Sequence, residues 1–465
     1  GFAYLMPSLM ELPGGGERVV FGLNLGLERV LGIRLAFGLN GISLPLFVLA
    51  GLVGFAAGWH ALRNAPTDRR NLFLGLLVLM HGGLMGVFGS IDLFFFYFFH
   101  ELALIPTFLM LGIWGRAGRR TVSMELTVYL TAGAMLSLIG IVALYASADG
   151  IAGFNFLALR RYLAAVPVEV ALQENFFGLL LLGFGILVSL FPFHSWAPRA
   201  YATAPTANAM LHAGVLKKFG VYGLVQIAAV LLPEGLLPWR DWLVWLALGN
   251  VVLIGFATVA QTNLRQMIAY SSVMHMGYIF LGLAAFGSAG FGGAVMLMFA
   301  HGLSVSAMLL LADYIEDRTG SLDMGRIGGM AAKTPLLAGL FVAATFAGVG
   351  LPGFANFWGE FSVFLSLGED YLWAVAPAGL GIVISAVYAL RAVARIFFGQ
   401  PTTEFRRAFD SGRLFDLAPA ERVPAFVLIV ALMFVGFWPR SVSDPIDAAL
   451  PETPAARAEL AEESR

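Results

Sequence analysis

Long apolar runs separated by short polar loops make up most of this chain between residues 41 and 440. A helix that crosses a bilayer needs about 20 consecutive, mostly apolar residues. Twelve runs meet this condition and predict twelve transmembrane helices, near residues 41–62, 70–89, 92–114, 124–147, 175–193, 206–232, 241–260, 266–287, 290–314, 334–367, 371–398 and 423–440. The pattern therefore indicates an all-α polytopic membrane protein.

Two of the twelve runs are predicted to be broken helices. The run 175–193 leads into Pro198, and the run 334–367 is too long for one straight span and is broken around Pro352. The two runs are five helices apart, and an odd spacing reverses the direction of a helix in the membrane. Paired interrupted helices of this kind point to a transport site near the middle of the bilayer. We therefore predict two inverted five-helix repeats, each with a broken helix, at residues 70–232 and 233–398.

Basic residues collect in alternate loops, which predicts the orientation of the chain. One set follows the first and third predicted helices and recurs on that side: Arg63, Arg69, Arg70, Arg116, Arg119, Arg120, Arg199, Arg265, Arg318, Arg326, Lys333, Arg406, Arg407 and Arg413. The opposite side has few basic residues near the predicted helices, namely Arg160, Arg161, Arg240 and Arg440. The positive-inside rule makes the first side cytoplasmic and places residues 148–174 and the C-terminal tail outside.

The other segments are assigned by their polarity and position. Residues 1–40 are predicted to lie outside the membrane, and because the chain starts at Gly1 rather than Met we expect a trimmed N-terminus. Residues 41–69 hold a leading helix, and residues 399–440 hold a loop and the final helix. Residues 441–465 form a polar tail, predicted to be disordered or a surface helix.

Composition supports the membrane assignment and excludes several functions. Hydrophobic residues make up 59% of the chain and charged residues 12%, with a mean hydropathy of +0.82, whereas soluble proteins carry about 25% charge. The net charge of -1 gives no indication of a nucleic-acid partner. The chain has no cysteine, which excludes disulfides and cysteine-ligated zinc or iron–sulfur sites. It also has no Gly-rich nucleotide-binding turn after a strand, so neither NADH nor flavin is expected to bind it.

Charged residues interrupt two apolar runs. Glu101 lies in mid-span after His100 and before Pro106, which leaves a backbone acceptor free nearby. Lys218 lies twelve residues into its run, beside Lys217. A charged side chain at the bilayer centre costs about 2.5–3.5 kcal/mol, so both spans indicate an ion path, with Lys218 preferred over its neighbour. The structural alternatives are a carboxylate paired with the next helix and a lysine that snorkels to the surface.

Two histidines and a second carboxylate extend the set. His275 and His301 lie within successive apolar runs, and an imidazole can pass protons through its two nitrogens near neutral pH. Glu360 follows the break at Pro352, where exposed backbone can hold polar groups at membrane depth. The alternatives are hydrogen-bonded core histidines and a glutamate that only caps the break. No ligand pair has the i, i+4 spacing of a helical metal site, so no metal is predicted.

Four segments carry a resemblance to a known family. They are HSWAPRAYATAPTANAMLHAGVLKKFGVYG, QTNLRQMIAYSSVMHMG, AHGLSVSAMLLL and LPGFANFWGEF. They resemble the antiporter-like subunits of respiratory complex I (NADH:quinone oxidoreductase) of the NuoM, or chain 4, type. Relatives include Mrp-type Na⁺/H⁺ antiporters and membrane-bound hydrogenases. The resemblance covers about residues 40–440 and implies fourteen helices, of which the first two are missing here.

The resemblance also implies roles for single residues. Proton translocation would fall to Glu101, Lys218, His275, His301 and Glu360. Supporting positions would be His100, Pro106, Pro192, His194, Trp196, His212, Lys217 and Pro352, among which Trp196 matches the tryptophan that follows the broken helix. The family usually has a lysine where this chain has Leu187, and that lysine pairs with the glutamate at Glu101. Its substitutes here could be His100, Lys217 or His212.

The function implied is that of a membrane-arm subunit that translocates protons, driven by redox chemistry elsewhere. NADH, FMN, iron–sulfur clusters and quinone would sit on partner subunits, with no cofactor in this chain. Partners would be neighbouring antiporter-like chains, the peripheral redox arm and the lipid bilayer, in a bacterial plasma membrane. The alternatives are a subunit of a multi-chain Na⁺/H⁺ antiporter and a subunit of a related hydrogenase or inorganic-carbon uptake complex.

Overall fold

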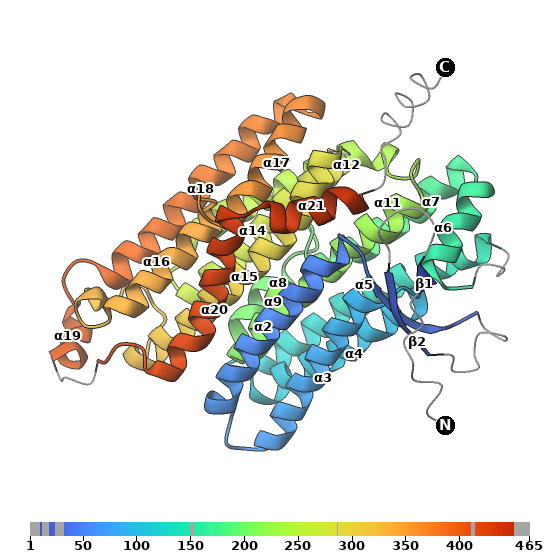
Figure 1. Cartoon of the computed structure of the whole chain (residues 1–465). Coiled ribbons are helices and arrows are strands. Elements are labelled where there is room, and N and C mark those ends of the chain that lie inside the picture. Colours follow the sequence, from blue (N-terminus) through green and yellow to red (C-terminus); the bar gives the residue numbers. More distant parts are fainter. Residues whose placement is uncertain are drawn as a thin grey trace.

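The fold is a bundle of long helices with a small sheet at one end (Figure 1). The computed structural model describes residues 10–11, 18–23, 32–148, 153–285, 287–410 and 414–450. The α-helices are α2 (Ser43–Asn64), α3 (Arg70–Gly89), α4 (Leu93–Trp114), α5 (Arg119–Ser147), α6 (Phe156–Ala165), α7 (Val170–Val188), α8 (Trp196–Thr203), α9 (Thr206–Gly214), α10 (Phe219–Gly223), α11 (Ala229–Leu231), α12 (Arg240–Leu248), α13 (Gly255–Ala260), α14 (Leu264–Ala284), α15 (Ser288–Thr319), α16 (Pro335–Val349), α17 (Ala355–Asp370), α18 (Leu372–Phe397), α19 (Thr403–Asp410), α20 (Pro419–Phe437) and α21 (Arg440–Ala449). The short tight or wide turns are η2 (Leu216–Lys218), η3 (Leu224–Ala228), η4 (Leu237–Trp239), η5 (Gly249–Ile254) and η6 (Met330–Ala332).

The predicted transmembrane helices are present. Eleven stretches of the described residues are long and apolar enough to span a membrane. The twelfth predicted run, 334–367, is divided at its predicted break into α16 and α17. Two short helices were not predicted, namely α6 and α19, because a search for runs of about 20 apolar residues does not detect them. α21 lies where a disordered tail or a surface helix was predicted.

The two broken helices enter the bundle from opposite ends, as the inverted repeats require. The N-terminus of α7 lies at the end that holds α6, whereas α16 begins at the end that holds α19 (Figure 1). There, the first turn of α16 is capped by the Asp416 carboxylate, which accepts from the backbone N–H groups of Leu336 and Leu337 at 2.7 and 3.0 Å. The all-α fold with two inverted, interrupted repeats is therefore confirmed.

The basic loops gather at one end of the bundle, which we call the basic end. Arg116, after α4, contacts Asp313 and Glu316 near the end of α15 at 3.4 and 2.5 Å. Arg318 contacts Glu421 at the start of α20 at 2.6 Å. The opposite, outer end holds the strands and α6 (Figure 1). This arrangement agrees with the charge asymmetry from which the cytoplasmic side was predicted.

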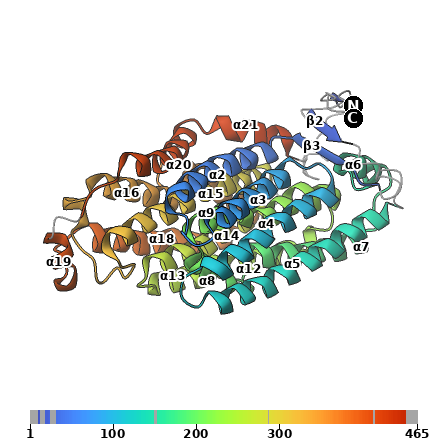
Figure 2. The ribbon, with the colours of Figure 1, turned by 90° about the horizontal axis from the view of Figure 1, so that it is seen from below.

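The segment before α2 contains strands. β1 (Met10–Glu11), β2 (Arg18–Leu23) and β3 (Leu35–Leu39) form an antiparallel sheet in the order β1-β2-β3. β3 is tied to the bundle by the Ile91 N–H, which donates to the Ala36 carbonyl at 3.1 Å. Residues 441–449 of the predicted polar tail belong to α21, which follows α20 along one side of the bundle (Figure 2). Residues 451–465 lie outside the described part.

Three spans form the core of the bundle. In α14, α15 and the interrupted span Thr206–Leu231, between 94% and 100% of the most apolar window is buried. In α5, α18 and α20 only 39% is buried, because their outward faces carry large exposed hydrophobic side chains that suit contact with lipid. Lys218, His275 and His301 all lie on the three core spans, so these polar groups are shielded from lipid on every side.

Candidate functional site

Lys218 and His301 form the central contact of the candidate site. The Lys218 ammonium nitrogen lies 2.8 Å from Nδ1 of His301 and 2.9 Å from the carbonyl oxygen of Ala213, to which it donates. Both side chains are buried. The structure therefore places the predicted lysine against the histidine of α15.

The helix that carries Lys218 is irregular where the lysine occurs. α9 ends at Gly214, a tight turn follows over Leu216–Lys218, and α10 starts at Phe219. In this turn the Lys218 N–H donates to the Val215 carbonyl at 2.9 Å, three residues back. The Ala213 carbonyl accepts from the lysine side chain at membrane depth. The break thus supplies the lysine with a backbone partner.

His275 and Glu360 form a second pair, next to the first. Nδ1 of His275 lies 3.8 Å from a carboxylate oxygen of Glu360, and Nε2 lies 3.1 Å from the hydroxyl of Tyr388. The rings of His275 and His301 are 6.0 Å apart between centroids. The spatial order is therefore Lys218, His301, His275 and Glu360, which we call the central row. It differs from the order along the chain, in which His275 precedes His301.

The break between α16 and α17 positions Glu360. Gly350 ends α16 with φ +81°, a left-handed conformation that favours glycine. The Glu360 carboxylate packs directly against this residue, and a side-chain carbon at position 350 would overlap it. Pro352 and Gly353 follow, and Trp358 anchors the start of α17 by donating to the Gly436 carbonyl at 2.7 Å. The break therefore makes room for the carboxyl group.

Glu101 approaches the turn that carries Lys218 through His100, which contacts Phe219 rather than Lys218 itself. Nδ1 of His100 lies 3.4 Å from a Glu101 carboxylate oxygen. The His100 ring is stacked on the ring of Phe219, with centroids 3.8 Å apart, and Phe219 follows Lys218 in the chain. Glu101 itself is only partly covered, with 34% of its side chain exposed. The α4 helix continues past it through Pro106.

Among the three predicted substitutes for the missing lysine, His100 is the one that contacts Glu101. Leu187 is buried against α5, where it packs near Gly133. Lys217 and His212 belong to a separate cluster: the Lys217 ammonium lies 5.3 Å above the Tyr201 ring and donates to the Ser272 carbonyl at 3.3 Å.

Trp196 completes that cluster. Its ring stacks on His212 with centroids 5.6 Å apart, and its indole N–H donates to the Ile186 carbonyl at 3.1 Å. The tryptophan therefore ties α8 back to the broken end of α7. Pro192 and His194 lie in the intervening loop, where the His194 ring stacks on Phe191 with centroids 5.6 Å apart. These supporting residues therefore stabilise the break between α7 and α8 and are not members of the central row.

One structural residue at this break was not predicted from the sequence. Asn250 is fully buried in the wide turn η5, where its amide donates to the carbonyls of Ser189 and Val273 at 3.0 Å each and its oxygen accepts from the Phe191 N–H at 2.7 Å. It therefore joins α7, η5 and α14. An isolated amide within an apolar run is the signal that could have revealed it.

Several buried polar atoms of the site have no hydrogen-bond partner among the described residues. They belong to the predicted residues or their neighbours and include Glu101 Oε1, Ser272 Oγ, His301 Nε2 and Glu360 Oε1. Buried polar groups in folded proteins are nearly always paired with protein or water. Such atoms mark positions where water can join the members of the row, and short hops along them suit the transfer of protons.

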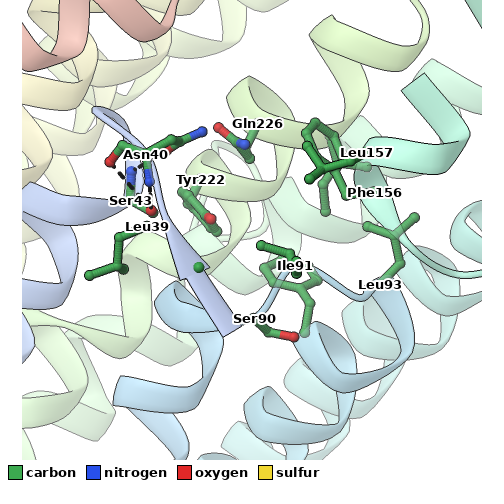
Figure 3. A pocket seen from close by; sticks show the side chains of 13 residues that line it. Leu39, Asn40, Ser43, Ser90, Ile91, Leu93, Phe156, Leu157, Tyr222 and Gln226 are labelled. Carbon is green, nitrogen blue, oxygen red and sulfur yellow. Dashed lines mark hydrogen bonds between the residues drawn. The ribbon is translucent and has the colours of Figure 1, made fainter. Parts of the chain in front are cut away.

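A pocket lies at the outer end of the span that carries Lys218 (Figure 3). Asn40 and Ser43 lie on one side of it, and Phe156 and Leu157 lie on the other. Gln226, two helical turns beyond Lys218, also lines the pocket, and its side-chain oxygen has no partner among the described residues. The polar groups that line the pocket therefore lie, on the side of the outer end, about two helical turns from Lys218 of the central row.

A family description matches residues 90–385 of the chain, which include every residue of the central row. It is the description "NADH:quinone oxidoreductase/Mrp antiporter, TM". A NAD(P)H-quinone oxidoreductase chain 4 from Synechococcus sp. (strain JA-2-3B'a(2-13)) is 31% identical over 432 residues, covering 90% of this chain and 78% of the relative. Another chain 4, from Picosynechococcus sp., is 33% identical over 401 residues and covers 85% and 71%.

Solved structures have the same fold. A chain of respiratory complex I from Thermus thermophilus superposes with a TM-score of 0.83 at 30% identity, covering 94% of this chain and 89% of that one. A chain of the Mrp complex from Dietzia sp. DQ12-45-1b superposes with a TM-score of 0.78 at 20% identity, covering 94% and 87%. The second likeness concerns the fold alone.

Proposed function

We propose, on the premise that this chain belongs to the NADH:quinone oxidoreductase/Mrp antiporter family, that it translocates protons through Glu101, His100 and the central row. The chain is an antiporter-like membrane subunit of the complex I type and a member of a multi-subunit membrane complex. The observation that carries the proposal is the series of close approaches from Lys218 through His301 and His275 to Glu360, at 2.8 Å, 6.0 Å between ring centroids and 3.8 Å.

The Lys218–His301 contact can set the direction in which a proton moves along the row. A hydrogen bond of 2.8 Å needs one donor and one acceptor, so a charged lysine is compatible with a neutral His301 nitrogen. Two like charges 4 Å apart repel each other by about 4 kcal/mol at an effective dielectric constant of 20. Moving one charge against 100 mV costs about 2.3 kcal/mol. A second proton arriving at this pair would therefore be driven onward to His275 and Glu360.

The energy would come from redox chemistry in partner subunits. We assign NADH, FMN, iron–sulfur clusters and quinone to those partner subunits. The partners of this subunit would be the neighbouring antiporter-like chains and, directly or through them, the peripheral arm. Protons would enter from the basic end, which the positive-inside rule makes cytoplasmic, and leave at the outer end of a bacterial plasma membrane. This chain would serve as the translocating part of the enzyme.

The test is Lys218→Met in the assembled complex, reconstituted in vesicles. We expect proton translocation to fall at least about tenfold, since a positioned proton-transfer group contributes two or more orders of magnitude. Lys333→Met is the matched control, because Lys333 is an exposed lysine at the basic end and lies outside the row. Unchanged translocation at unchanged NADH oxidation in Lys218→Met would refute the proposal.

A second candidate is a subunit of a multi-chain Na⁺/H⁺ antiporter. It is favoured by the family description, which covers Mrp antiporters as well, and by the shared fold with a chain of the Mrp complex. The two candidates differ in their requirements. Ion transport that depends on sodium and proceeds without NADH would support the antiporter, and transport that stops with quinone reduction would support the first proposal.

A further inference from the structure

A polar cavity opens at the basic end, outside the row described above. It lies where α2, α9 and α15 meet and has a volume of about 450 Å³. Its polar lining comes from His60, Asn64, Thr206, Asp313 and Asp317, together with Arg116. Asn64 and Asp317 are exposed, whereas His60 is buried, so the cavity leads from the surface to the imidazole.

The two nitrogens of His60 face different surroundings. Nδ1 lies 3.0 Å from the amide nitrogen of Asn64, and Nε2 lies 3.2 Å from a carboxylate oxygen of Asp313. Because an amide nitrogen can only donate, Nδ1 accepts that bond and Nε2 carries the proton that Asp313 accepts. One nitrogen therefore points to the exposed side of the cavity and the other to its buried wall, the arrangement that a proton relay needs.

Asp313 is held as a fixed anion. Arg265 and Arg116 approach its carboxylate at 3.3 and 3.4 Å, and the Thr206 hydroxyl donates to it. Arg265 is buried, with 1% of its side chain exposed. A carboxylate with two guanidinium partners keeps its charge, so its part is to orient the imidazole and to balance an added proton. His60 is then the group at this cavity whose two polar atoms face the exposed side and the buried wall.

The other groups around His60 come from every element packed against α2. α15 supplies Asp313 and Asp317, and the loop after α4 supplies Arg116. α14 supplies Arg265, which contacts Asp313. α9 and α3 contribute the uncharged Thr206 and Phe73 to the cavity, and the nearest acid of α20, Glu421, is paired with Arg318. The carboxylates of Asp313 and Asp317 thus offset the guanidinium groups of Arg116 and Arg265, so that a proton added to His60 meets no uncompensated positive charge.

Two neighbouring segments lead from the cavity to the central row, namely α9 with the turn η2 that follows it, and α15. They run antiparallel, with Thr206 beside Asp313 at one end and Lys218 beside His301 at the other. Between them the Ser306 hydroxyl lies 3.2 Å from the Met210 carbonyl. Twelve residues of helix span about 18 Å, which is the distance a proton must cover from the cavity to the row.

Asn208 offers a polar group on this path. It lies two residues beyond Thr206 on α9 and is fully buried, and its amide donates to the Thr107 carbonyl of α4 at 3.1 Å. Its side-chain oxygen has no partner among the described residues. A buried acceptor of this kind is a natural binding position for water between the cavity and His100 or Lys218.

We propose that this cavity is the cytoplasmic proton intake of the subunit and that His60 is its loading group. In each cycle Nδ1 takes one proton from water at the cavity mouth, and Nε2 gives one proton to a water molecule on the inner side of the ring. The neutral ring then carries its proton on Nδ1, and it is reset when Nδ1 returns that proton to water while Nε2 takes one, or when the ring turns over. The inference rests on the proposed function, since an intake has meaning only if the row carries protons.

The test is His60→Gln in the assembled complex in vesicles, with imidazole added as a small proton carrier. Glutamine keeps the size and hydrogen-bonding ability but cannot carry a proton. We expect translocation to fall at least about tenfold and to recover by half or more when imidazole is added on the side of the basic end. His81→Gln is the matched control, because His81 lies on α3 against Gly54, outside the cavity, and we expect no change there.

Two results would overturn the intake. One is undiminished translocation by His60→Gln in the absence of imidazole, and the other is a loss that imidazole does not restore, which would mark His60 as a structural residue. Lys218→Met, measured in parallel, separates this proposal from the proposed function. If Lys218→Met stops translocation and His60→Gln does not, the intake alone fails. If Lys218→Met has no effect, the row itself fails.

Discussion

Single residues decide how charge is held in the centre of this bundle. The Lys218 ammonium group is hydrogen-bonded to one histidine nitrogen and one backbone carbonyl in place of water. The histidine nitrogen is a proton acceptor within hydrogen-bonding distance. Lys217, one position earlier, faces an aromatic ring and a different carbonyl. Because consecutive residues of a helix point about 100° apart, only one of the two lysines can join the row.

Most residues of the row could be predicted from the sequence, because an ionisable group in a long apolar run is costly unless it has a role. Their order could not be predicted. Nothing in the spacing along the chain says that Lys218 meets His301 before His275, since this depends on how α14 and α15 pack around the broken span. Asn250 escaped prediction for the same reason: its three backbone partners come from segments far apart in the chain.

The contact between His100 and Glu101 leads to the first prediction. His100→Phe keeps a ring that can stack on Phe219 but removes the nitrogen that faces Glu101. We expect the variant complex to assemble normally and to translocate protons at least about tenfold more slowly, since a proton-transfer group is lost. Vesicle acidification with NADH measures the rate.

The control for this prediction is His81→Phe, a histidine on α3 outside the row. Normal translocation by His100→Phe would mean that His100 does not take the place of the lysine missing at Leu187, and that Glu101 acts without it.

At the scale of elements, the interruptions carry the function. α7 and α8, α9 and α10, and α16 and α17 are each separated by a break that brings backbone groups and polar side chains together in the membrane. The breaks after α7 and at Pro352 could be predicted, because proline and glycine end helices. Pro198, which was expected to mark the first break, lies within α8 instead. The break beside Lys218 could not, since the run contains no proline there and its glycines also occur in regular membrane helices.

Asn250 provides a test of the break after α7. In Asn250→Leu the carbonyls of Ser189 and Val273 and the N–H of Phe191 lose their partner. Leaving one buried group unsatisfied costs about 1–3 kcal/mol, so we expect a clearly lower midpoint of thermal unfolding for the purified complex. Thr258→Ala on the same span removes a hydroxyl that bonds only within its own helix, and we expect a smaller shift. An equal shift for both would contradict the role of Asn250.

Gly350 provides the corresponding test of the second break. Gly350→Ala places a methyl group where the Glu360 carboxylate lies and forces an L-residue into a left-handed conformation, which alone costs about 1–2 kcal/mol. We expect lower stability and slower translocation together. Gly339→Ala, in the middle of the same α16 helix, meets open space and should be neutral or slightly stabilising. Normal translocation by Gly350→Ala would show that the position of Glu360 is not critical.

At the scale of the whole molecule, polarity is arranged by depth. Charged clusters close the basic end, and lipid-facing apolar side chains cover the outer helices. Lys218, His275 and His301 lie on the three most buried spans, and Glu360 is buried on α17 beside them. The apolar runs predicted the spans because the bilayer imposes a length on them. The strands before α2 and the helices α6 and α19 were not predicted, because outside the membrane no such length applies.

The central claim is that protons reach the outer side through Glu360. The most direct measurement is the number of protons translocated per NADH oxidised by the complex with Glu360→Gln, which keeps the shape of the side chain but cannot release a proton. We predict a ratio clearly below that of the unmodified complex, with electron transfer retained or slowed. An unchanged ratio at an unchanged rate would contradict the role of Glu360 and, with it, the central row.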